Sequence, residues 1–452
     1  MTTALTRELG AFVAGLRYGQ IPAAALAVIR TGFTDCVGVM VAGSGEPVVQ
    51  LLVATLRPPA GEATLVFGPN TAAAPEAAWI NAVAAHALDF DDVALRGHPS
   101  AVLVPAILAE AQALGASGED MMTAYAAGYE TWAELVRREA DQHHGKGWHP
   151  TGIFGAIGAA AACASLRRLD AAKATHAIAL GASQSAGLMA NFGTMAKPYH
   201  AGRAAHAGVI SARLADAGFT ASPDALEHPQ GFLAAVSPAG RFDVAIPVEA
   251  GTNWKLTRDK LSVKKYPLCF CTHRALDGML DLIAANPVAA EKVSRVTVSI
   301  SPNHATILRN HLPQTGLEAK FSMEFAMASV LVAGRAGLAE LQDHFVRRPE
   351  VQALMPRVVI ERDEREDPAL PGKAIYDLVS VETKDGRRLE SARIKQVRGG
   401  PEQPLTRDEL WTKFDGCLQV GPGRVPARTL FDTLQSLDQL PHVNSLPGLG
   451  IV

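Results

Sequence analysis

The 452-residue chain has few aromatic residues, few charged residues for its length and only five cysteines. Aromatic residues make up 6% of the chain and charged residues 19%, whereas 48% of the residues are hydrophobic. Because Lys and Arg form no long basic run and the net charge is −3, the composition argues against nucleic acid as a partner. An odd number of cysteines in a long chain argues against a disulfide scaffold, and it favours reduced thiols in a cytoplasmic protein.

The sequence also lacks hydrophobic runs long enough to cross a membrane. The most apolar stretch, 152–166, is shorter than the ~20 residues that span a bilayer, so we interpret it as a buried helix. The first residues show no basic leader followed by an apolar run and a cleavage site. We therefore expect no membrane partner. At about 150 residues per domain, the length predicts two or three domain-sized units.

Alanine and glycine are abundant, and up to about residue 260 the apolar residues recur at helical spacing. Small side chains let helices approach closely, so this part predicts a tightly packed helical body. We expect helices at 22–42, 75–88, 100–114, 119–138, 152–166 and 170–185.

Near residue 260 the pattern changes. The segment 293–301 alternates apolar and polar residues and is rich in β-branched residues, which predicts a half-buried strand. After residue 400 the helical pattern returns, with Thr406 and Glu409 at capping-box spacing. Further strands are expected at 358–361, 376–383 and 388–394, with a hairpin turn at 384–386, and helices at 320–333, 337–345, 406–416 and 429–437.

These patterns predict a mainly α fold with a mixed insertion. The chain forms a large all-helical domain from both of its ends, residues 1–262 and 400–452. A smaller α+β domain, residues 263–399, is inserted between them. Its length of roughly 130 residues is ordinary for a domain.

A first polar cluster closes the apolar helix at 75–88. The carboxylates Asp89, Asp91 and Asp92 follow that helix, where they oppose its dipole, and His98 comes shortly after. Asp89 could orient or charge a neighbouring histidine, the acids could hold a metal, or Asp91 and Asp92 could cap the next turn. The lack of regularly spaced oxygen ligands argues against the metal site.

A second cluster contains His143, His144 and His149. His149 stands directly before the small-residue helix, whose free N–H groups and positive end form a natural anion site. It could bind a carboxylate or move a proton. His143 and His144 are interpreted as exposed loop residues. Zinc binding by His143, His144 and His149 is an alternative, but the lack of a cysteine or an acid that completes the set argues against it.

Two further clusters lie around Lys197 and His273. Lys197 has apolar flanks, so it could act as a base with a lowered pKa, or stay charged and hold a carboxylate. Arg203 could clamp a second carboxylate. The C-x-C-x-H pattern of Cys269, Cys271 and His273 is interpreted as two buried cysteines beside a histidine that lines the site.

The segments HALDFDD, GHPSAV, GWHPTG, KPYHAGRAA and KYPLCFCTH, in this order, resemble the MmgE/PrpD family. Family members include 2-methylcitrate dehydratases, cis-aconitate decarboxylases and iminodisuccinate epimerases. The resemblance implies a helical domain formed by both chain ends with an inserted α+β lid. It also implies a homodimer that works without a metal or another cofactor.

The resemblance further implies a metal-independent lyase of the 2-methylcitrate dehydratase type, acting on a small di- or tricarboxylate. Epimerisation or isomerisation, decarboxylation, and non-catalytic binding on the same scaffold remain alternatives. By motif matching, the catalytic residues correspond to Asp89, His98, His149 and Lys197, and the substrate-binding residues to His200, Arg203 and His273.

The sequence departs from the family pattern at three positions. The decarboxylase has a threonine at the position of Val93 and a tyrosine at the position of Phe321. The tyrosine proposed for the epimerase corresponds to a position near Gln142. These differences do not favour decarboxylation or epimerisation.

Overall fold

The computed structural model describes residues 4–368, 370–421 and 425–449. The chain divides into two compact units, which we call the helical unit (Met1–Val263 with Thr406–Val452) and the mixed unit (Lys264–Leu405). The fold is mainly α with some sheet, as the sequence predicts.

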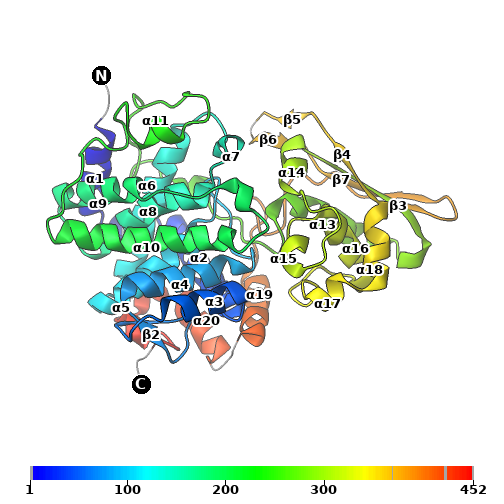
Figure 1. Ribbon diagram of the computed structural model, residues 1–452, viewed down its shortest axis with the longest axis horizontal. Helices are drawn as coiled ribbons and strands as arrows, with labels where there is room; N and C mark the ends of the chain where they lie inside the picture. Colours follow the sequence, from blue (N-terminus) through cyan, green and yellow to red (C-terminus); the bar gives the residue numbers. More distant parts are fainter. Residues whose placement is uncertain (1–3, 369, 422–424, 450–452) are drawn as a thin grey trace. The chain divides into compact units, whose positions relative to one another are not determined.

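Small-residue helices form the centre of the helical unit. Helix α8 (Pro150–Leu166) contacts both α6 (Gly118–Arg137) and α10 (Ala196–Asp216), and α10 also packs on α4 (Ala74–Ala87) (Figure 1). Nearly every residue of α8 is buried, most of them alanine or glycine. Because these side chains are short, the neighbouring backbones can approach α8 closely.

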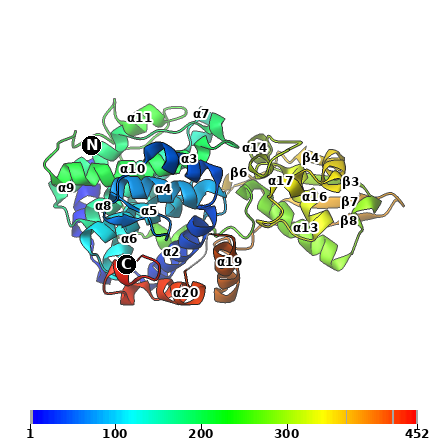
Figure 2. The ribbon, with the colours of Figure 1, turned by 60° about the horizontal axis from the view of Figure 1, so that its bottom comes forward.

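The C-terminal segment returns to the helical unit. Helices α19 (Arg407–Val420) and α20 (Ala427–Gln435) lie beside α2 (Ala23–Gly43) (Figure 2). The predicted capping box starts α19: the Thr406 side chain accepts from the Glu409 amide, and the Glu409 carboxylate accepts from the Thr406 amide. By length and composition α2 is the one described helix that could cross a membrane, and 67% of its most apolar window is buried inside the structure.

The six helices predicted before residue 190 are confirmed to within about two residues at each end. The helix predicted at 406–416 continues to Val420, and the last predicted helix is α20 followed by a 3-10 turn. The helical unit also contains α1 (Leu5–Gly15), α3 (Pro47–Leu56), α5 (Pro99–Leu114), α7 (His143–Lys146), α9 (Ala171–Ser183), α11 (Phe232–Val236), α12 (Lys255–Arg258), β1 (Ala63–Thr64) and β2 (Thr71–Ala72).

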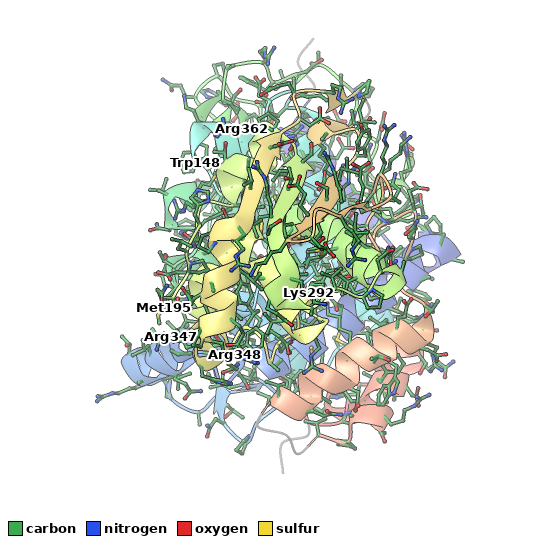
Figure 3. The ribbon with its side chains drawn as sticks, turned by 90° about the vertical axis from the view of Figure 1, so that its right-hand side faces the viewer. Trp148, Met195, Lys292, Arg347, Arg348 and Arg362 are labelled. Atoms are coloured by element: carbon green, nitrogen blue, oxygen red, sulfur yellow. The ribbon has the colours of Figure 1, made fainter. Side chains whose placement is uncertain are left out.

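A four-stranded sheet with the order β4-β3-β7-β8 forms the mixed unit. Strand β3 (Val293–Ile300) is parallel to β4 (Val358–Arg362) and antiparallel to β7 (Leu378–Thr383), which forms the predicted hairpin with β8 (Arg388–Glu390). Figure 3 labels Lys292, just before β3, and Arg362, the last residue of β4, at opposite ends of the parallel pair.

Helices α13 (His273–Ala285) and α16 (Met323–Ala333) contact each other and the sheet. Their packing closes the core of the mixed unit. The smaller elements are α14 (Pro302–Ile307), α15 (Gly316–Ala319), α17 (Asp343–Val346), α18 (Pro349–Leu354), β5 (Glu366–Asp367) and β6 (Leu370–Ala374).

The helix predicted at 337–345 is wrong for most of its length. Residues 337–342 form turns, and only α17 is helical. The Glu340 carboxylate accepts hydrogen bonds from the Gly337 amide (3.0 Å) and from Arg335 Nε (2.9 Å), which stabilises the turn. The helix predicted at 320–333 starts only at Met323, because Ser322 caps it by accepting from the Phe325 amide.

Candidate active site

His98 and His149 both stand immediately before a proline that begins a helix. His98 precedes α5 and His149 precedes α8, each as the N-cap residue without a capping hydrogen bond from its side chain. A residue before proline favours extended backbone, so it ends the preceding loop and presents its side chain at the helix start. There the positive end of the helix dipole disfavours a charged imidazole and favours an anion, whereas at His98 the nearby carboxylates of Asp89 and Asp91 favour the charged form.

Two glycines hold the backbone beside His149. The His149 amide donates to the Gly187 carbonyl at 3.0 Å, and Gly187 has a φ of +134° that favours glycine. A Cβ on Gly152 would collide with the carbonyl oxygen of Ala186. The segment around residue 187 can therefore lie directly against the start of α8.

Lys197, at the start of α10, forms an ion pair with Asp89. Both side chains are about 5% exposed, so Lys197 is buried and not an ordinary surface lysine. The Lys197 Nζ also lies 5.3 Å from the centre of the Phe192 ring. Asp89 has a φ of +51°, a region that is uncommon outside glycine and that is often found at functional sites.

Asp91 lies between two imidazoles. Its two carboxylate oxygens are each 3.0 Å from His86 Nδ1, and one of them is 2.9 Å from His98 Nδ1. The Nε2 atom of His98 lies 4.0 Å from Asp89 Oδ1. The rings of His86 and His149 stack at 5.9 Å with 21° between their planes, so three imidazoles gather around the acids.

His149 is also in contact with His200 of α10, since their Nδ1 atoms are 3.1 Å apart. One ring must donate to the other, and the Nε2 of His149 is buried without a hydrogen-bond partner among the described residues. The Phe192 ring packs edge-on against His149 at 4.8 Å. A buried polar atom without a partner is costly, which indicates a site for a ligand atom.

Burial keeps His86, His149 and His200 neutral at pH near 7. Burial lowers the pKa of His86 to about 3, although the attraction of Asp91 opposes it. Burial and then Lys197 hold the pKa of His149 well below its usual range, and the same two causes lower the pKa of His200 to about 4. Burial alone would raise the pKa of Asp91, but the two neighbouring imidazoles outweigh it and hold the pKa well below its usual range.

Asp92 has a different environment. Its side chain accepts from the Ser100 amide at 3.4 Å, so it caps an amide in the first turn of α5 and not in the turn directly after α4, where a cap is expected from the sequence. Burial, and then the negative charge of Asp35, raises the pKa of Asp92 well above its usual range. Asp92 therefore caps α5, whereas Asp91 contacts the histidines.

Two family models match the chain, the MmgE/PrpD N-terminal domain over residues 7–245 and the MmgE/PrpD C-terminal domain over residues 266–439. The chain belongs to the MmgE/PrpD family. Its relatives include three proteins named cis-aconitate decarboxylase. The protein from Homo sapiens is 29% identical over 75% of this chain and 71% of its own length. The protein from Mus musculus is 25% identical over 99% of this chain and 94% of its own length. One from Aspergillus terreus is 22% identical over 84% of this chain and 81% of its own length.

Membership in the MmgE/PrpD family supports a lyase-type role at the level of the family. Four predicted residues of this MmgE/PrpD chain meet in the helical unit: Asp89, His98, His149 and Lys197, with His200 beside them. Arg203, also on α10, contacts other residues. Its guanidinium is 4.5 Å from the Trp79 ring and near the imidazole of His206.

His273 belongs to the mixed unit and begins α13. Its ring is buried between Tyr266 and Phe270, and its Nε2 lies 3.1 Å from the Leu268 carbonyl oxygen. The five cysteines are buried, including Cys269 and Cys271, and no disulfide joins them in the described structure.

The prediction that His143 is an exposed loop residue is wrong. His143 begins the short helix α7 and is buried, because its ring packs edge-on against Phe154 of α8 at 4.8 Å. His144 is partly buried. The sequence reasoning also missed His86 and the role of Asp91, although their spacing of five residues across the end of α4 could have indicated a turn that brings them together.

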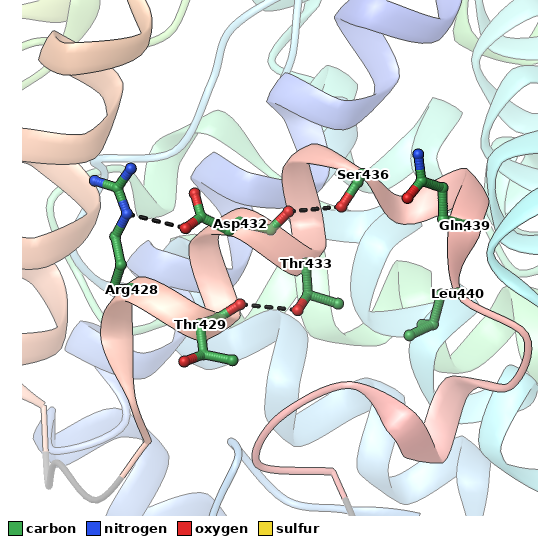
Figure 4. Close-up of a pocket in the computed structure, with 7 residues that line it drawn as sticks. All are labelled: Arg428, Thr429, Asp432, Thr433, Ser436, Gln439 and Leu440. Atoms are coloured by element: carbon green, nitrogen blue, oxygen red, sulfur yellow. Dashed lines mark hydrogen bonds and ion pairs between the residues drawn. The ribbon is translucent and has the colours of Figure 1, made fainter.

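A surface hollow of about 430 Å³ lies elsewhere in the helical unit (Figure 4). It is lined by α20 and the turn after it, and none of its seven lining residues is a predicted site residue. The hydroxyls of Thr433 and Ser436 donate to backbone carbonyls of their own helix. The hollow therefore offers few unsatisfied groups to a ligand.

Proposed function

We propose that the protein is a metal-independent lyase that removes water from a small hydroxy-polycarboxylate by general acid–base catalysis. The observation that carries this proposal is the gathering of three imidazoles, of which those of His86 and His149 are buried, beside the Lys197–Asp89 ion pair. Polar groups inside apolar helices are costly unless they have a use. Family membership supports the lyase class, and the residue geometry supports acid–base chemistry.

The site can recognise carboxylates in two ways. A substrate carboxylate could share the Lys197 ammonium with Asp89, which would keep the charge of the lysine paired. The starts of α5 and α8 add positive dipole ends beside His98 and His149. A small, strongly anionic substrate suits this arrangement better than a neutral one.

In the proposed elimination, Nε2 of His149 removes a proton from the carbon beside a carboxylate. The electron pair that is left forms an enolate-like anion, which the Lys197 ammonium stabilises. The anion then forms a carbon–carbon double bond and expels the hydroxyl group of the adjacent carbon. Cationic His98 donates its Nε2 proton to that hydroxyl, so water leaves, and proton transfer from His149 through solvent restores both imidazoles.

The same cluster offers donor atoms for a metal. Ligand atoms of His86, Asp89, Asp91 and His98 lie within 4.8 Å of one another. However, Asp89 is paired with the Lys197 ammonium and Asp91 is in contact with two imidazoles, so a cation would compete with groups already present. We therefore propose that turnover needs no metal.

Decarboxylation is the second candidate, because the three relatives described above are named cis-aconitate decarboxylases. The same basic and cationic groups could stabilise the carbanion left by loss of carbon dioxide and then protonate it. Val93 and Phe321 replace the hydroxyl-bearing residues of the decarboxylase pattern, which opposes this reaction. The products separate the two reactions, since one releases water and the other releases carbon dioxide.

Site variants test the proposal. His149→Gln and Lys197→Met should each lower kcat/KM for the dehydration by roughly 10²–10⁴-fold, the usual effect of removing an acid–base group. The matched controls His176→Gln and Lys173→Met change the same residue types on α9 and should keep wild-type activity. Unchanged turnover in both site variants would overturn the assigned roles. A protein that binds these acids, as a rise in melting temperature would show, but turns none over would be a binding protein instead.

A further inference from the structure

Asp91 contacts the Nδ1 atom of each of two histidines, His86 and His98. Both of its oxygens are 3.0 Å from His86 Nδ1, and Oδ2 is 2.9 Å from His98 Nδ1. The Nδ1 of His98 has a second acceptor, the backbone carbonyl oxygen of Asp92, at 2.9 Å. Asp91 is fully buried, and so is His86, so water does not compete for these contacts.

These contacts fix the protons on the imidazoles. An ionised carboxylate and a carbonyl oxygen are acceptors only, so His86 and His98 must carry a hydrogen on Nδ1. In its neutral form each ring then keeps its lone pair on Nε2. The two imidazoles hold the pKa of Asp91 well below its usual range, against the effect of burial, which keeps Asp91 an acceptor at neutral pH.

The remaining nitrogen of His98 faces the groups proposed to act on substrate. Its Nε2 lies 4.0 Å from Asp89 Oδ1, and Asp89 forms the ion pair with Lys197. If the ring carried its hydrogen on Nε2 instead, Nδ1 would place a lone pair against two acceptor oxygens. The geometry disfavours that tautomer strongly.

We propose that Asp91 is a positioning residue that keeps a hydrogen on Nδ1 of His86 and of His98, and so confines proton exchange between His98 and the substrate to Nε2. This inference rests on the proposed acid–base function of the same site. Asp91 itself does not need to touch the substrate. Its negative charge also stabilises the cationic form of His98, which donates the proton to the leaving group.

The first test uses the wild-type protein and needs no substrate. Nitrogen chemical shifts of the histidine side chains, measured by NMR, distinguish the two tautomers. We expect the neutral forms of both His86 and His98 to carry hydrogen on Nδ1. A neutral His98 with its hydrogen on Nε2 would overturn the proposal, whatever reaction the protein catalyses.

The second test is Asp91→Asn, which keeps the shape of the side chain and removes its charge. The other titratable groups near His98 stay in place: Asp89 and Asp92 in the loop, His86 on α4, and His144 and His149 before α8. Lys197 stays paired with Asp89. The pKa of His98 should fall by about one pH unit or more, as expected when an opposite charge is removed. We expect kcat to fall on the order of a hundredfold, with KM within about twofold, because Lys197 still binds the carboxylate.

The matched control is Asp92→Asn. The side chain of Asp92 accepts from the Ser100 amide, and an asparagine oxygen can accept the same hydrogen bond. The substitution also leaves in place the backbone carbonyl oxygen of Asp92, which is the atom that contacts His98 Nδ1. The tautomer and the pKa of His98 should stay as in the wild type. A merely structural role of Asp91 would leave the pKa of His98 unchanged in Asp91→Asn, and that result would also overturn the proposal. If no acid is turned over but the tautomers are as expected, the proposed function fails while the role of Asp91 in fixing the tautomers stands.

Discussion

Lys197 and Asp89 come from segments 108 positions apart, and they form a buried ion pair. The desolvation of two buried charges is balanced only while both partners remain. The pair therefore has two consequences at the level of single residues: it holds a cation ready for a carboxylate, and it makes each partner sensitive to the loss of the other.

Lys197→Met should lower the free energy of unfolding by about 3–5 kcal/mol, because it removes the ammonium group beside the buried carboxylate of Asp89. The double variant Asp89→Asn with Lys197→Met should recover most of this stability, since no buried charge is then left uncompensated. Chemical denaturation of the wild type, both single variants and the double variant measures the coupling. Strict additivity of the two substitutions would contradict the account.

His304 in the mixed unit provides a test of buried histidines away from the site. Burial, and then Lys373 and Arg274, lowers the pKa of His304 to about 3 from 6.5. Between these values a proton binds the unfolded state but not the folded state, so stability is full above about pH 6.5 and is lost as the pH falls. At pH 5 the loss should be about 2 kcal/mol relative to pH 7.

His304→Gln should remove this contribution. The difference in unfolding free energy between wild type and variant, measured by denaturation at about pH 7 and about pH 5, should shift by about 2 kcal/mol. The variant should lose less stability on acidification than the wild type. Parallel pH profiles for the two proteins would show that His304 takes up its proton in the folded state as readily as in the unfolded chain.

At the level of elements, the site depends on how closely α10 packs on α8. Lys197 and His200 belong to α10, and His149 precedes α8. A Cβ on Gly208 would lie 2.6 Å from the carbonyl carbon of Ala159 and 2.8 Å from the amide nitrogen of Ala160, both in the backbone of α8. The glycine is therefore required by the close approach of the two helices.

Gly208→Ala should force α10 away from α8, with a loss of about 1–3 kcal/mol of stability and a lower kcat. The control is Gly416→Ala in α19, where a Cβ meets nothing within 4 Å. There the better helix propensity of alanine should raise stability by about 0.5–1 kcal/mol. Thermal and chemical denaturation measure both effects. If Gly208→Ala left the stability unchanged, α10 and α8 would have room for a methyl group between them, which would contradict the prediction.

The positions of most helices and of the sheet could be predicted because apolar periodicity and caps such as Thr406 are local signals. That His98 and His149 stand at the starts of helices could be predicted for the same reason, because the proline that follows each of them is a local signal. The pairing of Lys197 with Asp89 and the burial of His143 against Phe154 depend on helices that meet only in the fold. Local pattern does not encode which helix faces meet. His86 and Asp91 differ from these pairs, because their contact is local and their spacing of five residues was a signal that could have indicated it.

At the level of the whole molecule, the chain combines an alanine-rich helical unit with a mixed unit inserted in its sequence. The proposed site residues of the helical unit come from the loop after α4 and from the starts of α5, α8 and α10, whereas His273 lies in the mixed unit. We propose a homodimer, as the family resemblance implies, that works in the cytoplasm, as the odd number of cysteines favours. Analytical ultracentrifugation measures the oligomeric state. A species of twice the 47.6 kDa chain mass is expected, and a monomer at assay concentration would contradict the proposed homodimer.

The central claim is tested most directly by incubating the EDTA-treated protein with a panel of small di- and tricarboxylates and identifying the products by mass spectrometry. The panel should include 2-methylcitrate, citrate and cis-aconitate. We predict that a hydroxy-polycarboxylate loses one water without added metal, and that Lys197→Met and His149→Gln lose this activity. Release of carbon dioxide from cis-aconitate without dehydration of any hydroxy acid would contradict the account, as would turnover that requires a metal.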